Sequence, residues 1–471
     1  MAGEKELSLK DRRFREFVLG GDMWKVVFTI CIPLAAYHGL LHIFKILDTM
    51  MAAHIGTDAV SSIAYISQIS FVISAIGGGL AIGAGMKISE AYGAGNYDLV
   101  KKRVSSVCAL CFIISIPVLL VIPFTPQFLR LNGTPEELIE ASGQYFSVEL
   151  VNIAVNFFNI IYIAIERARG NTKLIMWINL VYLVIKSVLT AVFVYVMNGT
   201  VVMIAFATLA ANLAMFVIAA VNMLKKGSIF GFSPKQISLR KAVILPVINT
   251  SYPAVTEKAA FAYGKLIVNK MSTEYGNSVV GALGVSNNLG GLTTNLQNGF
   301  QEGGASVISQ NIGAGKIPRA IDAFMKILIV NIVLGAVFMS LTLVFLDPLS
   351  SLFSGQDEEF RLLIKNVYGY EALGAVTLGV NAAVMALLYG FGYTKLTLVL
   401  NVLRVFVFRI PVLWFLQNFT DIGSESVGIV MLVSNVSVGV CAAIAGFFVI
   451  RRIKKKMPEQ TQETAAQTSK K

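Results

Sequence analysis

One glycine-rich stretch occurs twice in this chain, over residues 79–95 and again over residues 299–315, at an offset of 220 residues. Seven positions are identical in the two copies: Gly79 and Gly299, Gly83 and Gly303, Ile88 and Ile308, Ser89 and Ser309, Gly93 and Gly313, Ala94 and Ala314, and Gly95 and Gly315. About one identity would be expected by chance in so short a window. A period this long excludes a solenoid of short repeats. It predicts two duplicated halves, an organisation that in membrane proteins is typical of transporters.

Apolar runs of about 20 residues recur along the whole sequence, and each is long enough to cross about 30 Å of hydrocarbon as a helix. The mean hydropathy is +0.70. Of the 471 residues, 55% are hydrophobic and only 14% are charged, which is more apolar surface than a soluble core could bury. We therefore predict an all-α integral membrane protein with twelve transmembrane helices. These spans are expected near residues 26–50, 60–87, 103–125, 143–165, 174–197, 200–223, 243–271, 279–308, 322–346, 366–389, 396–418 and 427–450.

Positive charges are distributed unevenly between the two sides of such a protein. Of the 39 lysines and arginines, 29 fall in alternate segments that would face one side and three in those that would face the other. The positive-inside rule then places both termini in the cytoplasm. Because the basic residues lie in short loops, the net charge of +12 does not indicate a nucleic-acid partner. We expect an N-terminal six-helix bundle over residues 1–224, a basic linker over 225–242, a C-terminal six-helix bundle over 243–450, and a basic, disordered tail over 451–471.

An ordered set of short motifs runs through nearly the whole chain. It comprises Gly21-Asp-Met-Trp24 followed by Pro33 and Asp48, the turns Gly93-Ala-Gly95 and Gly313-Ala-Gly315, the segment Arg167 to Lys173, and Arg409-Ile-Pro411. This set resembles the multidrug and toxic-compound extrusion (MATE) transporters. The resemblance implies two six-helix bundles related by a pseudo-twofold axis along the membrane normal, with a central cleft that opens to either side in turn. It also implies export of organic cations and drugs in exchange for Na⁺ or H⁺.

Ionisable groups inside spans are costly unless they are paired or hydrated, so each is a candidate functional residue. In the first half, Asp48 shares a polar face of the first span with His38 and His42. The resemblance places Lys186 and Thr190 where many family members have an Asn/Asp pair, so that a lysine stands where a coupling cation would otherwise lie. We therefore expect an ion pair between Asp48 and Lys186; the alternative is that Lys186 snorkels to an interface. Further candidates in the fourth span are Glu149, Asn156 and Asn159, although the amides of the asparagines could equally form a structural seam.

In the second half, Glu257 follows Pro253 and matches the glutamate that the family uses in its seventh helix for cation coupling. Glu302 occupies a position where the first copy has Ile82, which breaks the symmetry of the duplication. Leu378 stands where the Na⁺-coupled branch of the family has an aspartate. The spans contain seven basic and five acidic residues, so the cleft is not expected to be strongly anionic.

The repeated turns suggest how the halves meet. Gly93, Gly95, Gly313 and Gly315 should allow the bundle ends to approach closely, because glycine removes side-chain bulk and permits positive φ. The two histidines four residues apart in the first span lack a third ligand, so no metal site is expected.

These features predict a secondary antiporter that exports amphipathic organic compounds across the cytoplasmic membrane in exchange for H⁺ or Na⁺. No nucleophile or metal constellation suggests an enzyme, and the glycine repeat lacks the Gly-Lys-Ser/Thr of a phosphate-binding loop. The alternatives are a flippase for lipid-linked precursors, from the same broad superfamily, and a channel. The expected partners are a small organic substrate and the lipid bilayer, with no cofactor beyond the coupling ion and a monomer as the functional unit.

Overall fold

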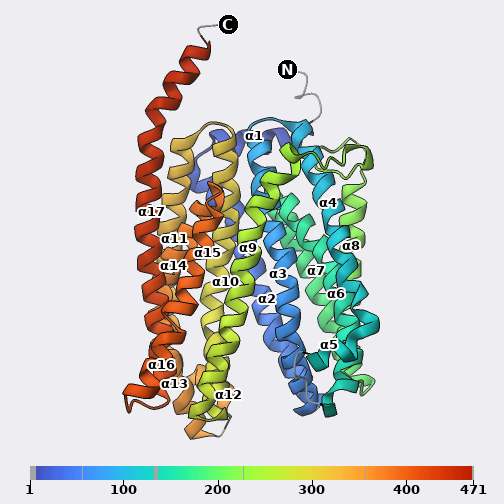
Figure 1. The fold of residues 1–471 in the computed structure, drawn as a ribbon, viewed down its shortest axis with the longest axis vertical. Coiled ribbons are helices and arrows are strands. Elements are labelled where there is room, and N and C mark those ends of the chain that lie inside the picture. The colour runs from blue at the N-terminus through green and yellow to red at the C-terminus, as the bar shows by residue number, and fades with distance from the viewer. Residues whose placement is uncertain (1–6, 56, 132–135, 226, 356, 469–471) are drawn as a thin grey trace.

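The computed structural model describes residues 7–55, 57–131, 136–225, 227–355 and 357–468. Within these ranges the chain is almost entirely helical and contains no strand (Figure 1). Helices are the expected outcome, because a backbone in hydrocarbon must satisfy its hydrogen bonds within its own segment.

The helices follow one another in two successive sets. The first half contains α1 (Leu9–Gly20), α2 (Met23–Ile55), α3 (Thr57–Gly93), α4 (Tyr97–Leu120), η2 (Ile122–Phe124), α5 (Thr125–Leu131), α6 (Glu136–Arg169), α7 (Thr172–Ala191), η3 (Val192–Val196) and α8 (Val201–Met223). After a linker with η4 (Pro234–Gln236), the second half contains α9 (Lys241–Ser272), η5 (Thr273–Tyr275), α10 (Asn277–Gly313), α11 (Ile317–Val344), α12 (Leu346–Ser354), α13 (Glu358–Leu373), α14 (Ala375–Gly390), α15 (Thr394–Val402), η6 (Leu403–Val407), α16 (Ile410–Phe419) and α17 (Glu425–Thr468).

Nine helical spans within the described residues are long and apolar enough to cross a membrane. A tenth is present if α13 and α14, which meet at a 47° bend, count as one broken span. The all-helical membrane fold is thereby confirmed, whereas the number twelve stays a prediction. Two predicted spans, which correspond to α9 and α10, are not apolar enough to be counted among these, because charged and amide side chains lower their hydropathy. Both helices nevertheless run along most of the bundle (Figure 1).

The two halves meet along the glycine faces of α3 and α10. A Cβ added at Gly79 would lie 2.4 Å from the backbone nitrogen of Val255 in α9. A Cβ added at Gly299, the equivalent residue of the second copy, would lie 2.3 Å from the Cα of Ala35 in α2. Val255 and Ala35 are themselves 220 residues apart. The glycine repeat is therefore a pseudo-twofold symmetric interface between the halves.

The two Gly-Ala-Gly turns also touch each other. A Cβ added at Gly93 would lie 2.0 Å from the carbonyl oxygen of Gln310, and one added at Gly313 would lie 1.9 Å from that of Glu90. The predicted close approach of the bundle ends is therefore present. Toward the opposite end of the molecule, α9 and α10 diverge from α2 and α3, so the halves are packed at the end where the termini lie (Figure 1).

Both turns finish on a glycine in the left-handed region. The φ angles are 74° at Gly95 and 72° at Gly315, a conformation that other residues adopt only with strain. This backbone geometry allows the chain to reverse between α3 and α4 and between α10 and α11 within three residues.

Helix α1 lies across the packed end and is bonded to both halves. Arg169, the last residue of α6, donates to Asp11 through Nε at 2.5 Å and through Nη2 at 2.9 Å. From the second half, Lys316 donates to the carbonyl oxygen of Leu19 at 2.8 Å. Helix α1 therefore ties the end of the first half to the beginning of α11.

The C-terminal tail differs from the sequence-based expectation. Composition predicts disorder over residues 451–471, but α17 continues as a helix to Thr468, and residues 469–471 lie outside the described part. Alanine, lysine, glutamate and glutamine are good helix formers. They extend a helix that is already formed, so no new nucleation is needed. In Figure 1 this extension projects beyond the bundle.

Candidate functional site

Two adjoining cavities lie in the interior of the bundle. The first has a volume of about 340 Å³ and the second about 480 Å³. Six residues line both: Phe261, Asn295, Asn298, Gln301, Asn381 and Arg404. The two cavities therefore adjoin along this wall, and together we call them the cleft. The second cavity is lined by residues of both halves, so the cleft lies between them.

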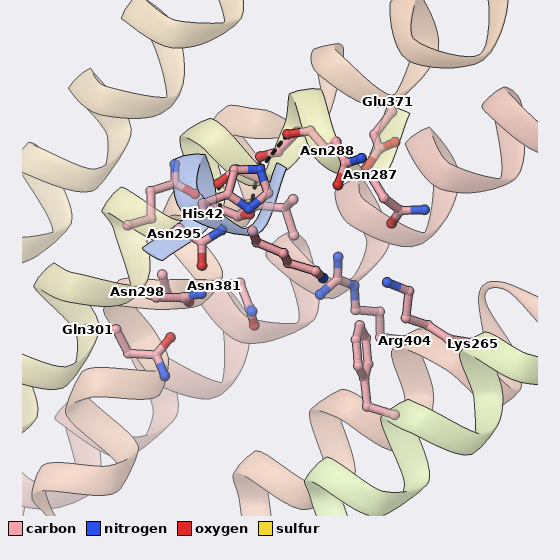
Figure 2. A pocket seen from close by; sticks show the side chains of 18 of the residues that line it. His42, Lys265, Asn287, Asn288, Asn295, Asn298, Gln301, Glu371, Asn381 and Arg404 are labelled. Atoms are coloured by element: carbon pink, nitrogen blue, oxygen red, sulfur yellow. Dashed lines mark hydrogen bonds between the residues drawn. The ribbon is translucent and has the colours of Figure 1, made fainter. Parts of the chain in front are cut away.

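A row of amide side chains on α10 forms one wall of the first cavity (Figure 2). It consists of Asn288, Asn295, Asn298 and Gln301, whose spacings return to one face of a helix. His42 of α2 lies against this row, with Nε2 2.7 Å from the carbonyl oxygen of Asn288. This row was not among the predicted sites, although its periodicity is a signal in the sequence.

Basic side chains from other helices occupy another edge of the first cavity. Figure 2 places Lys265 of α9 and Arg404 of η6 at this edge. Arg404 donates to Oδ1 of Asn435 at 2.7 Å. Arg409 donates to Oγ of Ser434, with nitrogen–oxygen distances of 3.1 and 3.2 Å. Within the residues that the structure describes, none of these three basic side chains forms an ion pair with a carboxylate.

Glu257 of α9 is buried in the wall of the second cavity. Its carboxylate accepts hydrogen bonds from the hydroxyl of Tyr389 at 2.8 and 3.0 Å, from Oγ1 of Thr397 at 2.7 Å, and from Nδ2 of Asn401 at 2.7 Å. All three partners are neutral, and the described part of the chain offers it no ion pair. Hydroxyl and amide oxygens around a carboxylate are the ligand types that a small hard cation prefers.

Glu302 of α10 lines the same cavity and joins the two halves. It forms an ion pair with Arg167 of α6, and the Nε2 atom of His38 lies 3.5 Å from its carboxylate. The sequence predicted Glu302 as a site, whereas Arg167 stood out only as the first residue of a family motif. No local pattern connects two residues that lie 135 positions apart.

The predicted ion pair between Asp48 and Lys186 is present in the first half. Their side chains are 20% and 18% exposed, so neither charge snorkels into open solvent. Glu149 lies on α6 and accepts a hydrogen bond from Asn152 at 3.0 Å. Asp48, Lys186 and Glu149 line neither cavity, so this polar cluster is separate from the cleft.

The remaining predicted residues also lie outside both cavities. Asn159 is fully buried and donates to the carbonyl oxygen and Oδ1 of Asn212 at 3.0 and 3.2 Å, which joins α6 to α8. This contact corresponds to the structural seam that the sequence left open. Thr190 is fully buried near the end of α7, and Asn156 is half-buried on α6.

A duplicated helical bundle that is packed at one end and encloses a polar cleft between its halves is the architecture of a membrane transporter. The MatE family model matches residues 33–196 and 253–415, one match in each half. The chain belongs to the MatE family. It is therefore a multi-pass membrane transporter and not an enzyme.

Named relatives and solved structures agree with this family. The chain is 23% identical to a probable multidrug resistance protein, YoeA, of Bacillus subtilis, over 85% of this chain and 88% of the relative. It is 25% identical to the multidrug export protein MepA of Staphylococcus haemolyticus, over 68% and 70% of the two chains. Among solved structures, it is similar to a multidrug resistance MATE transporter in an outward-facing conformation, with a TM-score of 0.88 and 17% identity over 93% of this chain and 98% of that one.

Proposed function

We propose that this protein is a secondary active antiporter that exports amphipathic organic compounds across the cytoplasmic membrane in exchange for H⁺ or Na⁺. The observation that carries the proposal is the buried carboxylate of Glu257 in the wall of the cleft, whose hydrogen-bond partners among the described residues are all neutral. The names of YoeA and MepA, which refer to multidrug resistance and export, support the substrate class.

Glu257 is placed to couple ion and substrate. A buried carboxylate without a cationic partner is costly, so binding of H⁺ or Na⁺ compensates the charge. Thr397 and Tyr389 can turn their hydroxyl lone pairs toward a bound cation, because a hydroxyl is both donor and acceptor. Since Tyr389 and Asn401 also line the second cavity, this rearrangement changes the surface that a substrate contacts.

The exchange mechanism requires the cleft to open alternately at the two ends of the bundle. With both termini in the cytoplasm, as the basic loops favour, the packed glycine interface closes the cytoplasmic end and this conformation is outward-facing. We take residues 1–224 and 243–450 as the moving bodies of a functional monomer, with residues 225–242 as the linker.

In the first half, the ammonium group of Lys186 lies beside Asp48, where it compensates the carboxylate that would otherwise attract a coupling cation. Ion binding is therefore assigned to Glu257 in the second half. We expect no Na⁺ to bind in the Asp48 cluster at neutral pH.

The test is uptake into proteoliposomes with an imposed H⁺ or Na⁺ gradient, using a panel of charged and neutral fluorescent compounds. Glu257→Gln keeps the shape and several hydrogen bonds of the side chain but removes its charge. We expect this variant to fold and insert while gradient-driven transport is lost. The matched control is Glu359→Gln, which changes an exposed glutamate of α13 and should transport as the wild type does. Gradient-driven transport at the wild-type rate by Glu257→Gln would rule out the assignment.

A further inference from the structure

The charge of the first cavity is strongly unbalanced. Its described lining contains four basic residues and a single acidic one: Lys45, Lys265, Arg404, Arg409 and Glu371. The single carboxylate of Glu371, which also accepts a hydrogen bond from Ser286, interacts electrostatically with Lys265, Arg404 and Arg409 and offsets only part of this positive charge. Like charges collected in a cavity of low dielectric destabilise one another unless a counterion is present. A ligand that carries negative charge would therefore be bound favourably here.

The basic groups are only partly occupied by the protein. Lys265 has no hydrogen bond or ion pair within the described residues. Arg404 donates one hydrogen bond to Asn435, and its guanidinium carbon lies 5.4 Å from the ring centre of Phe261. Its buried Nε atom has no hydrogen-bond partner within the described residues. Because neither Lys265 nor Arg404 is paired with a carboxylate within the described residues, the charge of these two side chains remains available to a ligand in the cavity.

The duplication brings equivalent basic positions to the same cleft. Lys45 of α2 and Lys265 of α9 are separated by the 220-residue offset of the repeat, and both line the first cavity. His38 and Lys258 have the same offset, and both line the second cavity. An anion near the pseudo-twofold axis would thus be attracted by both halves.

The second cavity supplies an apolar surface next to this basic region. Phe71 and Met86 of α3 and Met385 of α14 line it, together with the shared ring of Phe261. A ligand that extends from one cavity into the other meets cationic donors at one end and these apolar side chains, which lie in the same cavity wall as Glu257 and Glu302, at the other. These are the complementary features of an amphipathic anion.

We propose that the cleft binds amphipathic organic anions, with a carboxylate or phosphate group beside Lys265, Arg404 and Arg409 and an apolar body in the second cavity. The planar guanidinium groups match the oxygen geometry of such anions. This inference rests on the proposed function, because it names the substrate class of the same cleft. It also differs from the organic cations that the family resemblance implies.

The test is equilibrium binding to the purified full-length protein in detergent, with two probes that share a naphthalene ring. One probe is 2-naphthoate and the other is its trimethylammonium counterpart. We expect the wild type to prefer naphthoate, and Lys265→Gln to weaken naphthoate binding by about tenfold or more. Lys265→Glu should invert the preference toward the cationic probe. Lys365→Gln, which removes a partly exposed lysine of α13 that pairs with Asp347 outside the cleft, is the matched control and should bind both probes as the wild type does.

Several outcomes would overturn the inference. These are tighter binding of the cationic probe by the wild type, an equal loss of both probes in Lys265→Gln, or inorganic phosphate binding as tightly as naphthoate, which would assign the site to a free anion. A thermal unfolding midpoint for each variant separates misfolding from lost binding, and Lys265→Gln carries the test if Lys265→Glu does not fold. The binding assay uses no gradient, so its result is independent of the transport assay. If naphthoate binds but gradient-driven export is absent, the antiport mechanism is contradicted while the anion site still stands.

Discussion

Charged residues at membrane depth are compensated differently in the two halves. In the first half, Asp48 and Lys186 neutralise each other within the protein. In the second half, Glu257 has only neutral donors and Lys265 has no partner within the described residues. A buried charge without a partner destabilises the protein, so we expect one to persist only where a bound ligand compensates it. This difference between residues is the reason for placing the proposed ion site at Glu257, whereas the proposed substrate site lies in the cleft between the halves.

The Asp48–Lys186 pair should behave as a coupled unit. Changing either residue alone to asparagine leaves one charge inside the bundle without its partner, whereas changing both removes the two charges together. We expect the double variant Asp48→Asn/Lys186→Asn to be less destabilised than the sum of the single variants, with a coupling energy of about 1–3 kcal/mol. The measurement is a double-mutant cycle on the free energy of unfolding in sodium dodecyl sulfate.

An exposed pair provides the control for this cycle. Lys102 and Asp98 form an ion pair at 2.6 Å on α4, with side chains 36% and 67% exposed. Exposed pairs contribute about 0–1 kcal/mol, so their cycle should give a smaller coupling energy. If the changes in the free energy of unfolding of the two single variants add up to that of the double variant, the contact between Asp48 and Lys186 does not stabilise the protein.

Some contacts between single residues could be predicted from the sequence, and others could not. The contact between Asp48 and Lys186 could be predicted because the family resemblance supplied the register between two helices. Lys265, Arg404 and Arg409 could not be predicted as a cluster, since α9, η6 and the start of α16 approach one another only through tertiary packing. Local periodicity carries information along one helix but not between helices.

At the scale of single elements, α1 has a role that its basic composition does not indicate. The basic residues before the first span fit the positive-inside rule, but α1 also lies across the packed end and bonds to both halves through Asp11 and Leu19. In the proposed exchange mechanism, opening of that end separates the halves, so we expect at least one of these contacts to break in each transport cycle.

Arg169→Ala should loosen α1. The bidentate bond from Arg169 to Asp11 is charge-assisted, and such bonds contribute about 1.5–3 kcal/mol. We expect the backbone amides of α1 to exchange with deuterium about tenfold faster or more in this variant. Arg12→Ala is the control, because among the described residues Arg12 pairs only with Glu16, on the exposed side of the same helix. Equal exchange rates in the two variants would mean that Arg169 does not hold α1.

The whole molecule combines a symmetric interface with an asymmetric cleft. Gly83 packs on Ser251 and Gly303 packs on Cys31, two contacts related by the 220-residue offset. The duplicated fold could therefore be predicted, because close helix packing leaves glycines at fixed spacings in both copies. The cleft could be predicted less completely: Glu302 of the second copy replaces Ile82 of the first, and nothing in the repeat shows that Arg167 is its partner.

The packed end should open when the repeated turns are given side chains. A methyl group at Gly93 or Gly313 would overlap a carbonyl oxygen of the other half, and overpacking of this kind costs about 1–3 kcal/mol. We expect Gly93→Ala and Gly313→Ala to destabilise the conformation closed at this end and to slow turnover, with less effect on substrate binding.

Cys31 reports this opening, because it is fully buried against Gly303 in the interface between α2 and α10. In a background with Cys108, Cys111 and Cys441 changed to alanine, maleimide should label Cys31 about tenfold faster in the two turn variants than in the parent. Gly284→Ala is the matched control on α10, since a Cβ there meets no atom within 4 Å. If the turn variants label and turn over as Gly284→Ala does, the Gly-Ala-Gly turns do not govern access to the cleft, and the conformational cycle must be controlled elsewhere in the interface.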